Sequence, residues 1–329
     1  MKAILHSLCR ALCLFALIVI FDTGSTKAQE SKFEYGFTYG PSNFLGDLGG
    51  NSGKGAAFLK DNMVSLTKFM TGFNIAYRPA EFINFRLSIN MGKVQGADSL
   101  ITGKGGMEEA RKARNQHFRS DIQEGFIAAE IYPTALFEYD AQDVMHRFRP
   151  YALLGIGAFH FNPQGQYETA DGSKIWVDLK PLRTEGQGMP AFPDRKEYSL
   201  TQINIPYGVG VKYFVSQKIA VSFELINRKT FTDYIDDVST NYISNEDFYA
   251  YFGDGTEKAK QAVQMANKSA FANGGNYRPG FGIGAKRGSP TNNDAYYSSS
   301  LKISIRLGKS EQYNNYGRGS DVKCPIIRF

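Results

Sequence analysis

The sequence contains few of the residues that cross-link chains, bind metals or carry out catalysis. Among its 329 residues are three cysteines, four histidines and one tryptophan. Cys9 and Cys13 lie close to the N-terminus, so Cys324 is the cysteine that we expect in the mature chain. A single cysteine excludes an internal disulfide framework and a CxxC metal site.

Long apolar runs are also missing, with one exception near the N-terminus. Residues 11–21 are apolar, follow the basic residues Lys2 and Arg10, and precede the small residue Ala28. This order is typical of a secretory signal peptide, and the run is too short for the alternative, a membrane anchor. We therefore expect residues 1–28 to be a cleaved signal peptide. No later stretch approaches the roughly 18 apolar residues of a transmembrane helix.

Neither sign of charge dominates the chain. Its 38 basic and 32 acidic residues give a formal net charge of +6, which is too mild to indicate binding to nucleic acid. Hydrophobic residues make up 42% and charged residues 21%, and this composition excludes a disordered chain. What is abundant is glycine (34), phenylalanine (25) and tyrosine (19), a combination that favours a β-rich fold.

Apolar and polar residues alternate with a period of two in much of the chain, which is typical of strands with two different faces. In residues 69–77, for example, Phe73 and Ile75 share one face while Gly72 and Asn74 share the other. The alternation predicts eight strands, at residues 33–40, 69–77, 82–92, 122–137, 147–161, 203–214, 218–227 and 297–307.

The connections between these strands alternate strictly in length. The long connections are residues 41–68, 93–121, 162–202 and 228–296; the short ones are 78–81, 138–146 and 215–217. Long loops at one rim and short periplasmic turns at the other are typical of a transmembrane barrel. We therefore predict an all-β fold, an eight-stranded antiparallel transmembrane β-barrel over residues 29–307, followed by a polar periplasmic tail at 308–329. A soluble lipocalin-like barrel, the alternative, would have its apolar residues inside.

The inward face of the predicted barrel carries charges of both signs. They are Glu34, Arg86, Glu130, Lys212, Glu224, Lys302 and Arg306. An eight-stranded barrel is just wide enough for side chains to fill it, and buried charges need partners. We expect an ion-pair network that plugs the lumen; a selective channel is the alternative.

Two stretches within the long connections have the composition of helices. Residues 256–272 begin at Thr256, a suitable N-cap, and end before Gly274. Residues 106–116 are a weaker case.

Catalytic and ligand-binding motifs are scarce. His117, His146 and His160 do not form a metal-binding spacing, and no GxSxG sequence occurs. The glycines in residues 280–284 do not have the context of a phosphate-binding loop. We therefore predict no enzyme activity, no catalytic residues, no cofactor and no metal.

The most distinctive segment is residues 228–242, where carboxylates gather between aromatic residues. The candidate residues are Thr232, Asp233, Tyr234, Asp236, Asp237, Val238, Ser239 and Thr240. Asp and Thr side chains at a loop base hydrogen-bond to backbone amides, which favours a loop-structuring role. The alternatives are a partner-binding surface and a Ca²⁺ site, although the EF-hand spacing is absent.

Five stretches of the chain carry a resemblance to a known family. They are GPSNFLGDLGG (40–50), FNIAYRPAEFINFRLSIN (73–90), RFRPYALLGIGAFHFNP (147–163), LTQINIPYGVGVKYFV (200–215) and FTDYIDDVSTNYI (231–243). They resemble the PorG-like outer-membrane β-barrel family, which is associated with the type IX secretion system. The TDYIDDVST block is the most specific of them. This chain departs from the family in its very long 228–296 connection and its polar tail.

The resemblance implies a non-enzymatic barrel in the cell outer membrane that accompanies the periplasmic ring of the secretion apparatus. Its expected partners are outer-membrane lipids and the ring proteins, a PorK-like lipoprotein and a PorN-like protein, with no nucleic acid. We therefore expect an accessory or anchoring component of protein secretion. The alternatives are a free-standing structural or adhesive barrel of OmpA type and an outer-membrane enzyme.

Overall fold

The computed structural model describes residues 32–48, 64–101, 107–137, 147–216 and 218–306. The expected signal peptide (1–28), the expected tail (308–329) with Cys324, and His146 lie outside the described residues. No helix of the described part of the chain is long and apolar enough to cross a membrane.

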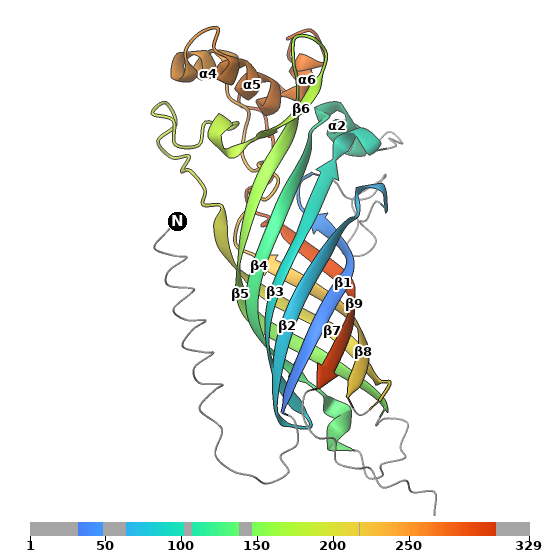
Figure 1. The fold of residues 1–329 in the computed structure, drawn as a ribbon. Helices are drawn as coiled ribbons and strands as arrows, with labels where there is room; N and C mark the ends of the chain where they lie inside the picture. The colour runs from blue at the N-terminus through green and yellow to red at the C-terminus, as the bar shows by residue number, and fades with distance from the viewer. Residues whose placement is uncertain (1–31, 49–63, 102–106, 138–146, 217, 307–329) are drawn as a thin grey trace, which may run out of the picture. The chain divides into compact units, whose positions relative to one another are not determined.

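Eight long strands form a closed antiparallel barrel, in which each strand pairs with its neighbours along the chain and the last pairs with the first (Figure 1). These strands are β1 (Phe33–Leu45), β2 (Lys68–Ala80), β3 (Ile83–Ala97), β4 (His117–Ile131), β5 (Phe148–Glu168), β7 (Thr201–Phe214), β8 (Ile219–Thr230) and β9 (Ala295–Arg306). The predicted fold class, strand number and alternation of long and short connections are confirmed.

The long-loop ends of several strands extend further than the alternation predicts. β5 continues to Glu168, and its end pairs with an additional short strand, β6 (Lys174–Asp178). The predicted 162–202 loop is therefore partly a hairpin. The sequence does not alternate in this extension, which contains polar residues such as Gln164 and Gln166. Above the membrane neither face of a strand has to be apolar.

The predicted strand 122–137 is wrong at its C-terminal end. β4 ends at Ile131, and Pro133–Leu136 form a 3₁₀ helix, η4. Pro133 stands at the start of η4, where its fixed φ suits a helical turn and its missing N–H leaves no hydrogen bond unmade.

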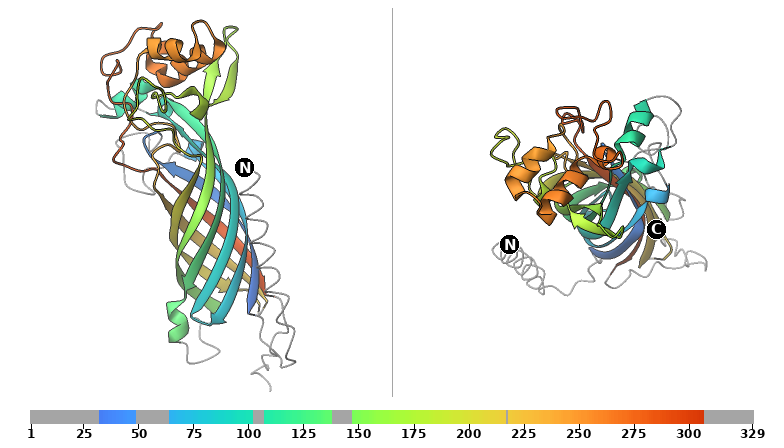
Figure 2. Two further views of the ribbon diagram at one scale, coloured as in Figure 1. Left: turned by 90° about the vertical axis from the view of Figure 1, so that its left-hand side faces the viewer. Right: turned by 90° about the horizontal axis from the view of Figure 1, so that it is seen from above.

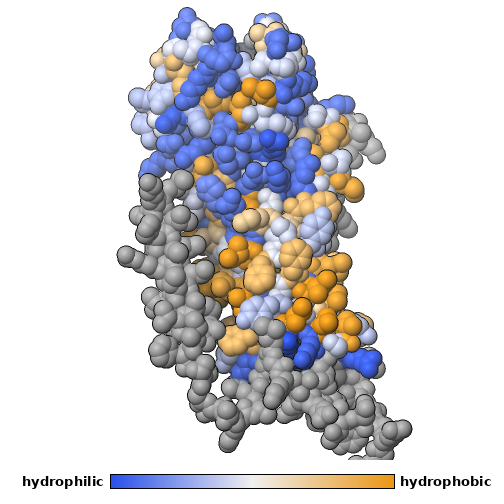
Figure 3. Space-filling model, viewed as in Figure 1, coloured by the Kyte–Doolittle hydropathy of each residue, from blue (hydrophilic) through white to orange (hydrophobic). Residues whose placement is uncertain are grey.

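The outer surface of the barrel is apolar and its interior is polar. In β3, Phe85 and Ile89 are 47% and 48% exposed, whereas Arg86 and Asn90 on the opposite face are buried. Figure 3 shows the resulting band of hydrophobic residues below a hydrophilic upper part. An ion pair between Lys93 and Asp121, both well exposed, lies on the outer surface above this band. This is the inside-out polarity of a barrel that spans a bilayer, not that of a lipocalin.

The predicted ion-pair network fills the lumen. In its middle tier, Nη1 of Arg86 lies 2.6 Å from Oε1 of Glu224 and 2.9 Å from Oε1 of Glu130. The ammonium of Lys302 reaches the same two carboxylates at 2.5 and 3.2 Å. The hydroxyl of Tyr151 also donates to Glu224. Two cations thus share two anions, all of them buried.

Two further tiers lie above and below this cluster. Toward the short-turn rim, Lys212 donates to both oxygens of Glu34 at 2.6 Å, and Arg306 lies 3.5 Å from Glu34. Toward the long loops, Arg228 pairs with Glu124 at 3.2 Å. The alternation does not predict this last pair, because it places Arg228 in a loop and Glu124 in a strand of irregular alternation.

The long connections carry all the described helices except η4, and these helices gather at one end of the barrel (Figures 1 and 2). The α-helices are α2 (Met107–Arg114), α4 (Asn245–Phe252), α5 (Glu257–Ala266) and α6 (Lys268–Phe271); the 3₁₀ helices there are η2 (Val64–Leu66), η3 (Asp98–Leu100) and η5 (Lys180–Leu182). We call residues 43–48, 94–101, 107–120, 162–200 and 231–294 the cap.

The predicted helix at 256–272 is present as two helices. The Thr256 hydroxyl accepts from the N–H of Ala259 at 3.2 Å, as its predicted N-cap role requires. Asn267 interrupts the helix, and its side-chain oxygen caps α6 by accepting from Ala270 N–H at 3.0 Å. A helix that the sequence pattern did not predict is α4, which begins with a capping box between Ser244 and Asp247.

Breaking the middle tier should destabilise the barrel strongly. We expect Glu224→Leu to lower the free energy of unfolding by about 3–5 kcal/mol, because it leaves Arg86 and Lys302 buried with one carboxylate. The matched control, Asp121→Asn, breaks only an exposed pair and should cost less than about 1 kcal/mol. Urea titrations of the protein refolded into lipid vesicles measure both values. Equal losses in the two variants would contradict a structural role for the lumen network.

Candidate functional site

The distinctive segment at residues 232–240 leaves β8 and runs into the base of the cap, where it is covered on all sides. Asp236 and Asp237 are 0% exposed and Asp233 is 5% exposed. Thr232, Val238 and Ser239 are also buried, and Tyr234 and Thr240 are half-buried. The structure therefore brings the predicted residues together in the interior, which favours the loop-structuring interpretation over direct contact with a partner.

Asp236 links two long connections. Its Oδ2 accepts from the N–H of Leu48 at 2.9 Å, and its Oδ1 accepts from the N–H of Val238 at 3.0 Å. Two carboxylates outside the predicted segment also accept hydrogen bonds from backbone N–H groups. Asp47 accepts from the N–H of Ser289, and Asp294 accepts from the N–H of Ile235 at 2.8 Å. Asp236 and Asp47 thus join the β1–β2 connection to the β8–β9 connection, whereas Asp294 ties together the two ends of the β8–β9 connection.

Asp237 adopts a left-handed backbone conformation, with φ of 62°. Its carboxylate accepts from the hydroxyl of Tyr198 at 2.7 Å and from the hydroxyl of Thr184. An aspartate tolerates this conformation better than most residues do. Asp237 thereby turns the chain and ties it to the connection between β5 and β7.

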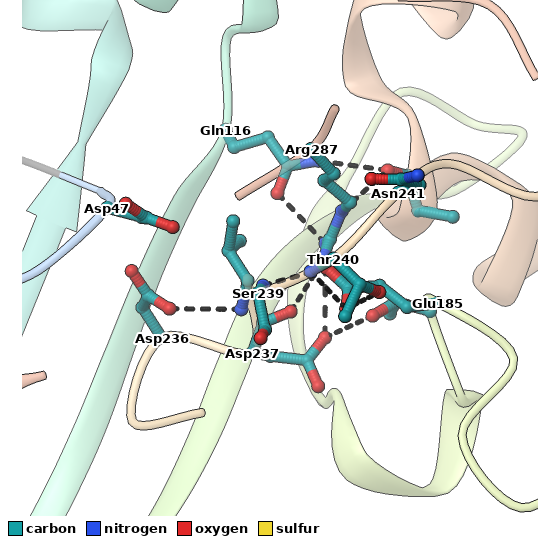
Figure 4. Close-up of polar contacts among 12 residues, drawn as sticks. Asp47, Gln116, Glu185, Asp236, Asp237, Ser239, Thr240, Asn241 and Arg287 are labelled. Atoms are coloured by element: carbon teal, nitrogen blue, oxygen red, sulfur yellow. Dashed lines mark hydrogen bonds and ion pairs between the residues drawn. The ribbon is translucent and has the colours of Figure 1, made fainter. Parts of the chain in front are cut away.

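Glu185 is a further residue of this site that the sequence pattern does not reveal. Its carboxylate accepts from the N–H groups of Ser239 and Thr240, both at 2.9 Å, and pairs with Arg287 at 2.8 Å (Figure 4). Arg287 also donates to Gln116 at 3.0 Å. One buried ion pair therefore joins three long connections. No motif marks Glu185 or Arg287, and they lie 102 residues apart.

The charges of four carboxyl groups in this site repel one another. They belong to Asp47, Asp233, Asp236 and Asp294. Burial raises the pKa of Asp233 to about 8, and the charges of Asp47 and Glu185 add to the effect. Burial and neighbouring carboxylates raise the pKa values of Asp236 and Asp294 well above the usual range. Burial also raises the pKa of Asp237 to about 6, despite the opposing charge of Arg287. Burial therefore favours the neutral form of Asp233, Asp236 and Asp294.

The alternatives for this segment gain no support from the geometry. Within the described residues, no group of three or more histidine, cysteine, aspartate or glutamate side chains is arranged to hold a metal ion. His117 contacts Lys268, with 2.7 Å between Nδ1 and Nζ, and His160 contacts Thr201 at 3.1 Å. These two histidines lie apart from the carboxylates in the hydrogen-bond network, so the structure does not assemble a triad around Asp236 or Asp237.

A family model described as a domain of unknown function, DUF6089, matches residues 11–256. No curated protein matches the chain. Among solved structures, Neisserial surface protein A is 10% identical, with a TM-score of 0.35, over 85% of this chain and 99% of that one. Ail from Yersinia pestis is 7% identical, with a TM-score of 0.34, over 85% and 100%. A major outer membrane protein from Thermus thermophilus is 10% identical, with a TM-score of 0.36, over 84% and 99%.

The stability of the cap should fall as pH rises. A buried carboxyl whose pKa is about 8 in the folded state and about 4 in the unfolded chain keeps a proton that unfolding releases. The folded state is therefore favoured below pH 4 and progressively loses that advantage up to pH 8. We expect hydrogen exchange in residues 231–243, corrected for its intrinsic pH dependence, to be faster at pH 9 than at pH 6.

Asp233→Asn should remove part of this difference, because the amide cannot ionise while Asp236 and Asp294 still can. Asp194→Asn, which changes an exposed aspartate of the cap, is the control and should keep the wild-type pH dependence. A pH dependence unchanged in Asp233→Asn would show that this carboxyl does not cause it.

Proposed function

The chain belongs to the family described as domain of unknown function DUF6089, and we propose that it is a non-conducting outer-membrane barrel that anchors and binds other proteins. The proposal has three parts. The barrel resides in the outer membrane, it neither transports solutes nor catalyses a reaction, and its partners belong to a protein-secretion complex.

The observation that carries the proposal is the filled lumen. Three tiers of buried charges occupy it from Glu34 and Lys212 to Glu124 and Arg228. A cavity between the middle and upper tiers, lined in part by Arg86 and Asn90, has a volume of about 10 Å³, roughly the space for one water molecule. A barrel filled in this way supports a role in holding position and contacting partners.

Catalysis by the aspartate segment is disfavoured on chemical grounds. The oxygens of Asp236 accept hydrogen bonds from the backbone, and those of Asp237 accept from Thr184 and Tyr198. A general base or nucleophile needs access to its substrate, whereas these carboxylates are buried among loop contacts. This supports the proposal of a non-enzymatic protein.

The finer proposal is an accessory component of the type IX secretion system that binds its periplasmic ring. The resemblance to PorG-like barrels supports it, above all the TDYIDDVST block. The short-turn rim, which we assign to the periplasm, offers a surface for this contact. After β4, Leu136 and Phe137 are 61% and 70% exposed, and they follow the last lipid-facing residue of that strand, Ile131. Large exposed apolar side chains are the anchors that protein partners cover.

The plugged lumen predicts the absence of a channel. In planar lipid bilayers, the purified wild-type protein should give no stable conductance steps, since the tiers leave no continuous water path. A larger 16-stranded porin is the positive control, because its lumen is open. Stable, ion-selective steps from the wild-type barrel would overturn the proposal and support the channel alternative.

Affinity purification tests the secretion role. From gently solubilised outer membranes, the tagged wild-type protein should recover the ring lipoprotein and its partner. Leu136→Glu with Phe137→Glu should reduce that recovery several-fold, because charges replace the exposed apolar anchors. The matched control is Phe271→Glu, which changes an exposed aromatic residue of the cap and should leave recovery unchanged. Recovery of the wild-type barrel alone, with the ring intact in the same membranes, would instead favour a free-standing or adhesive barrel.

A further inference from the structure

A cleft opens in the cap between residues 180–200 and helices α4 and α5. Its volume is about 450 Å³, within the range of small-molecule sites. In Figure 1, α4 and α5 lie at the top of the molecule beside the yellow-green segment that includes residues 180–200. The lining combines three cations, one acid and two aromatic rings: Lys180, Arg183, Lys258, Glu197, Tyr251 and Phe252. The contacts described above for residues 232–240 do not involve these six side chains.

The positive charges of the cleft are only partly compensated. Glu197 lies 3.9 Å from Lys180 and 3.6 Å from Arg183, and its side chain is well exposed. Lys258 lies with its ammonium 4.8 Å from the centre of the Phe252 ring. One partly solvated carboxylate facing three cations leaves the cleft positive, which favours an anionic ligand.

Arg183 is held in place at an energetic cost to the backbone. Its φ is 52°, in the left-handed region that is unfavourable for a residue with a long side chain. Among the described residues, the other non-glycine positions with positive φ are Asn115 and Asp237, whose residue types tolerate it. The Arg183 guanidinium donates to the carbonyl of Gln187 and lies 5.3 Å from the centre of the Tyr251 ring. Strained residues of this kind cluster at ligand clamps.

The aromatic rings add a second kind of recognition. Tyr251 is 40% exposed and Phe252 is half-buried, so ring surface is available at the mouth of the cleft. Aromatic faces stack against the C–H faces of sugar rings, while arginine and lysine bind carboxylate and sulfate groups. A free inorganic anion would not stack on the rings, and a neutral sugar would not form ion pairs with the cations.

We propose that this cleft binds an acidic saccharide, one that carries carboxylate or sulfate groups on its sugar rings. Arg183 and Lys258 bind the acid groups, and Tyr251 stacks on a sugar face. The site lies in the cap, away from the short-turn rim, so it does not depend on the secretion role proposed above. A saccharide site in the cap is equally compatible with a barrel that has no secretion partner.

Isothermal titration calorimetry of the full-length protein in detergent micelles tests this binding. The probes are a sulfated heparin-derived tetrasaccharide, a tetragalacturonate and, as the neutral control, maltotetraose. We expect binding of at least one acidic probe, weakened by added salt, and none of maltotetraose. Preference between the acidic probes distinguishes sulfate from carboxylate recognition.

Matched variants locate the binding in the cleft. Lys258→Gln and Tyr251→Ala should each weaken it by about tenfold, since each removes one charge-assisted or stacking contact. Lys260→Gln is the control, because Lys260 lies on the same helix, is exposed and pairs with Glu257; it should bind as the wild type does.

Three outcomes would overturn the proposal: no binding of either acidic probe, equal binding of maltotetraose, or equal binding by the Lys258→Gln and Lys260→Gln proteins. If Tyr251→Ala fails to fold, the comparison of the two lysine variants decides alone, since both lysines are exposed.

Discussion

The compensation of charge inside a narrow closed barrel is the constraint on which the rest of this structure depends. An eight-stranded barrel must fill its own interior, and this chain fills it with Glu130 and Glu224 shared between Arg86 and Lys302. The same pairs fix strand register. A slip of one residue in β3 would move Arg86 into lipid and Phe85 into the lumen. The same ion pairs therefore both seal the lumen and specify the strand register.

The cap satisfies its buried carboxylates by a different rule. Asp236 and Asp294 accept hydrogen bonds from backbone N–H groups, whereas Glu185 and Asp98 pair with the buried cations Arg287 and Arg114. Long loops have many backbone groups without a ladder partner, and a buried N–H has to be satisfied. Short acceptor side chains at the loop bases meet that need. Within the TDYIDDVST block, Asp236 meets this requirement.

The parts of the molecule that the sequence predicts are those governed by short-range periodicity. Alternation with a period of two revealed the strands, because lipid and lumen impose opposite chemistry on successive residues. It also predicted the inward charges of the middle tier. This alternation is lost above the membrane, where both faces tolerate polar residues. It therefore predicts a loop at the end of β5 and over the whole of β6.

Long-range partners were beyond the reach of the sequence for a related reason. Asp236 and Asp237 stood out because they are adjacent to one another, whereas Asp47, Glu185 and Asp294 are single acidic residues in different connections. Only the closure of the barrel brings those connections together. Likewise, nothing in the spacing of Arg183 and Tyr251 indicates that one lies over the ring of the other. Local composition therefore identifies residues 232–240, whereas their contacts depend on how the closed barrel brings the long connections together.

The extension of β5 above the membrane has a consequence for binding at the cap. A strand of about 9–11 residues is enough to cross a bilayer, yet β5 has 21 residues. Its upper part pairs with β6, which leads directly into Lys180–Leu182, and the hydroxyl of Tyr167 on β5 donates to Glu257 of α5 at 2.7 Å. One wall of the cleft therefore follows directly from the strand paired with β5, and α5 of the other wall is hydrogen-bonded to β5 itself. Loops that are already ordered pay less conformational entropy when a ligand binds. A barrel with flexible loops of the same composition would hold the same cations and rings with weaker affinity, because it would have to order them first.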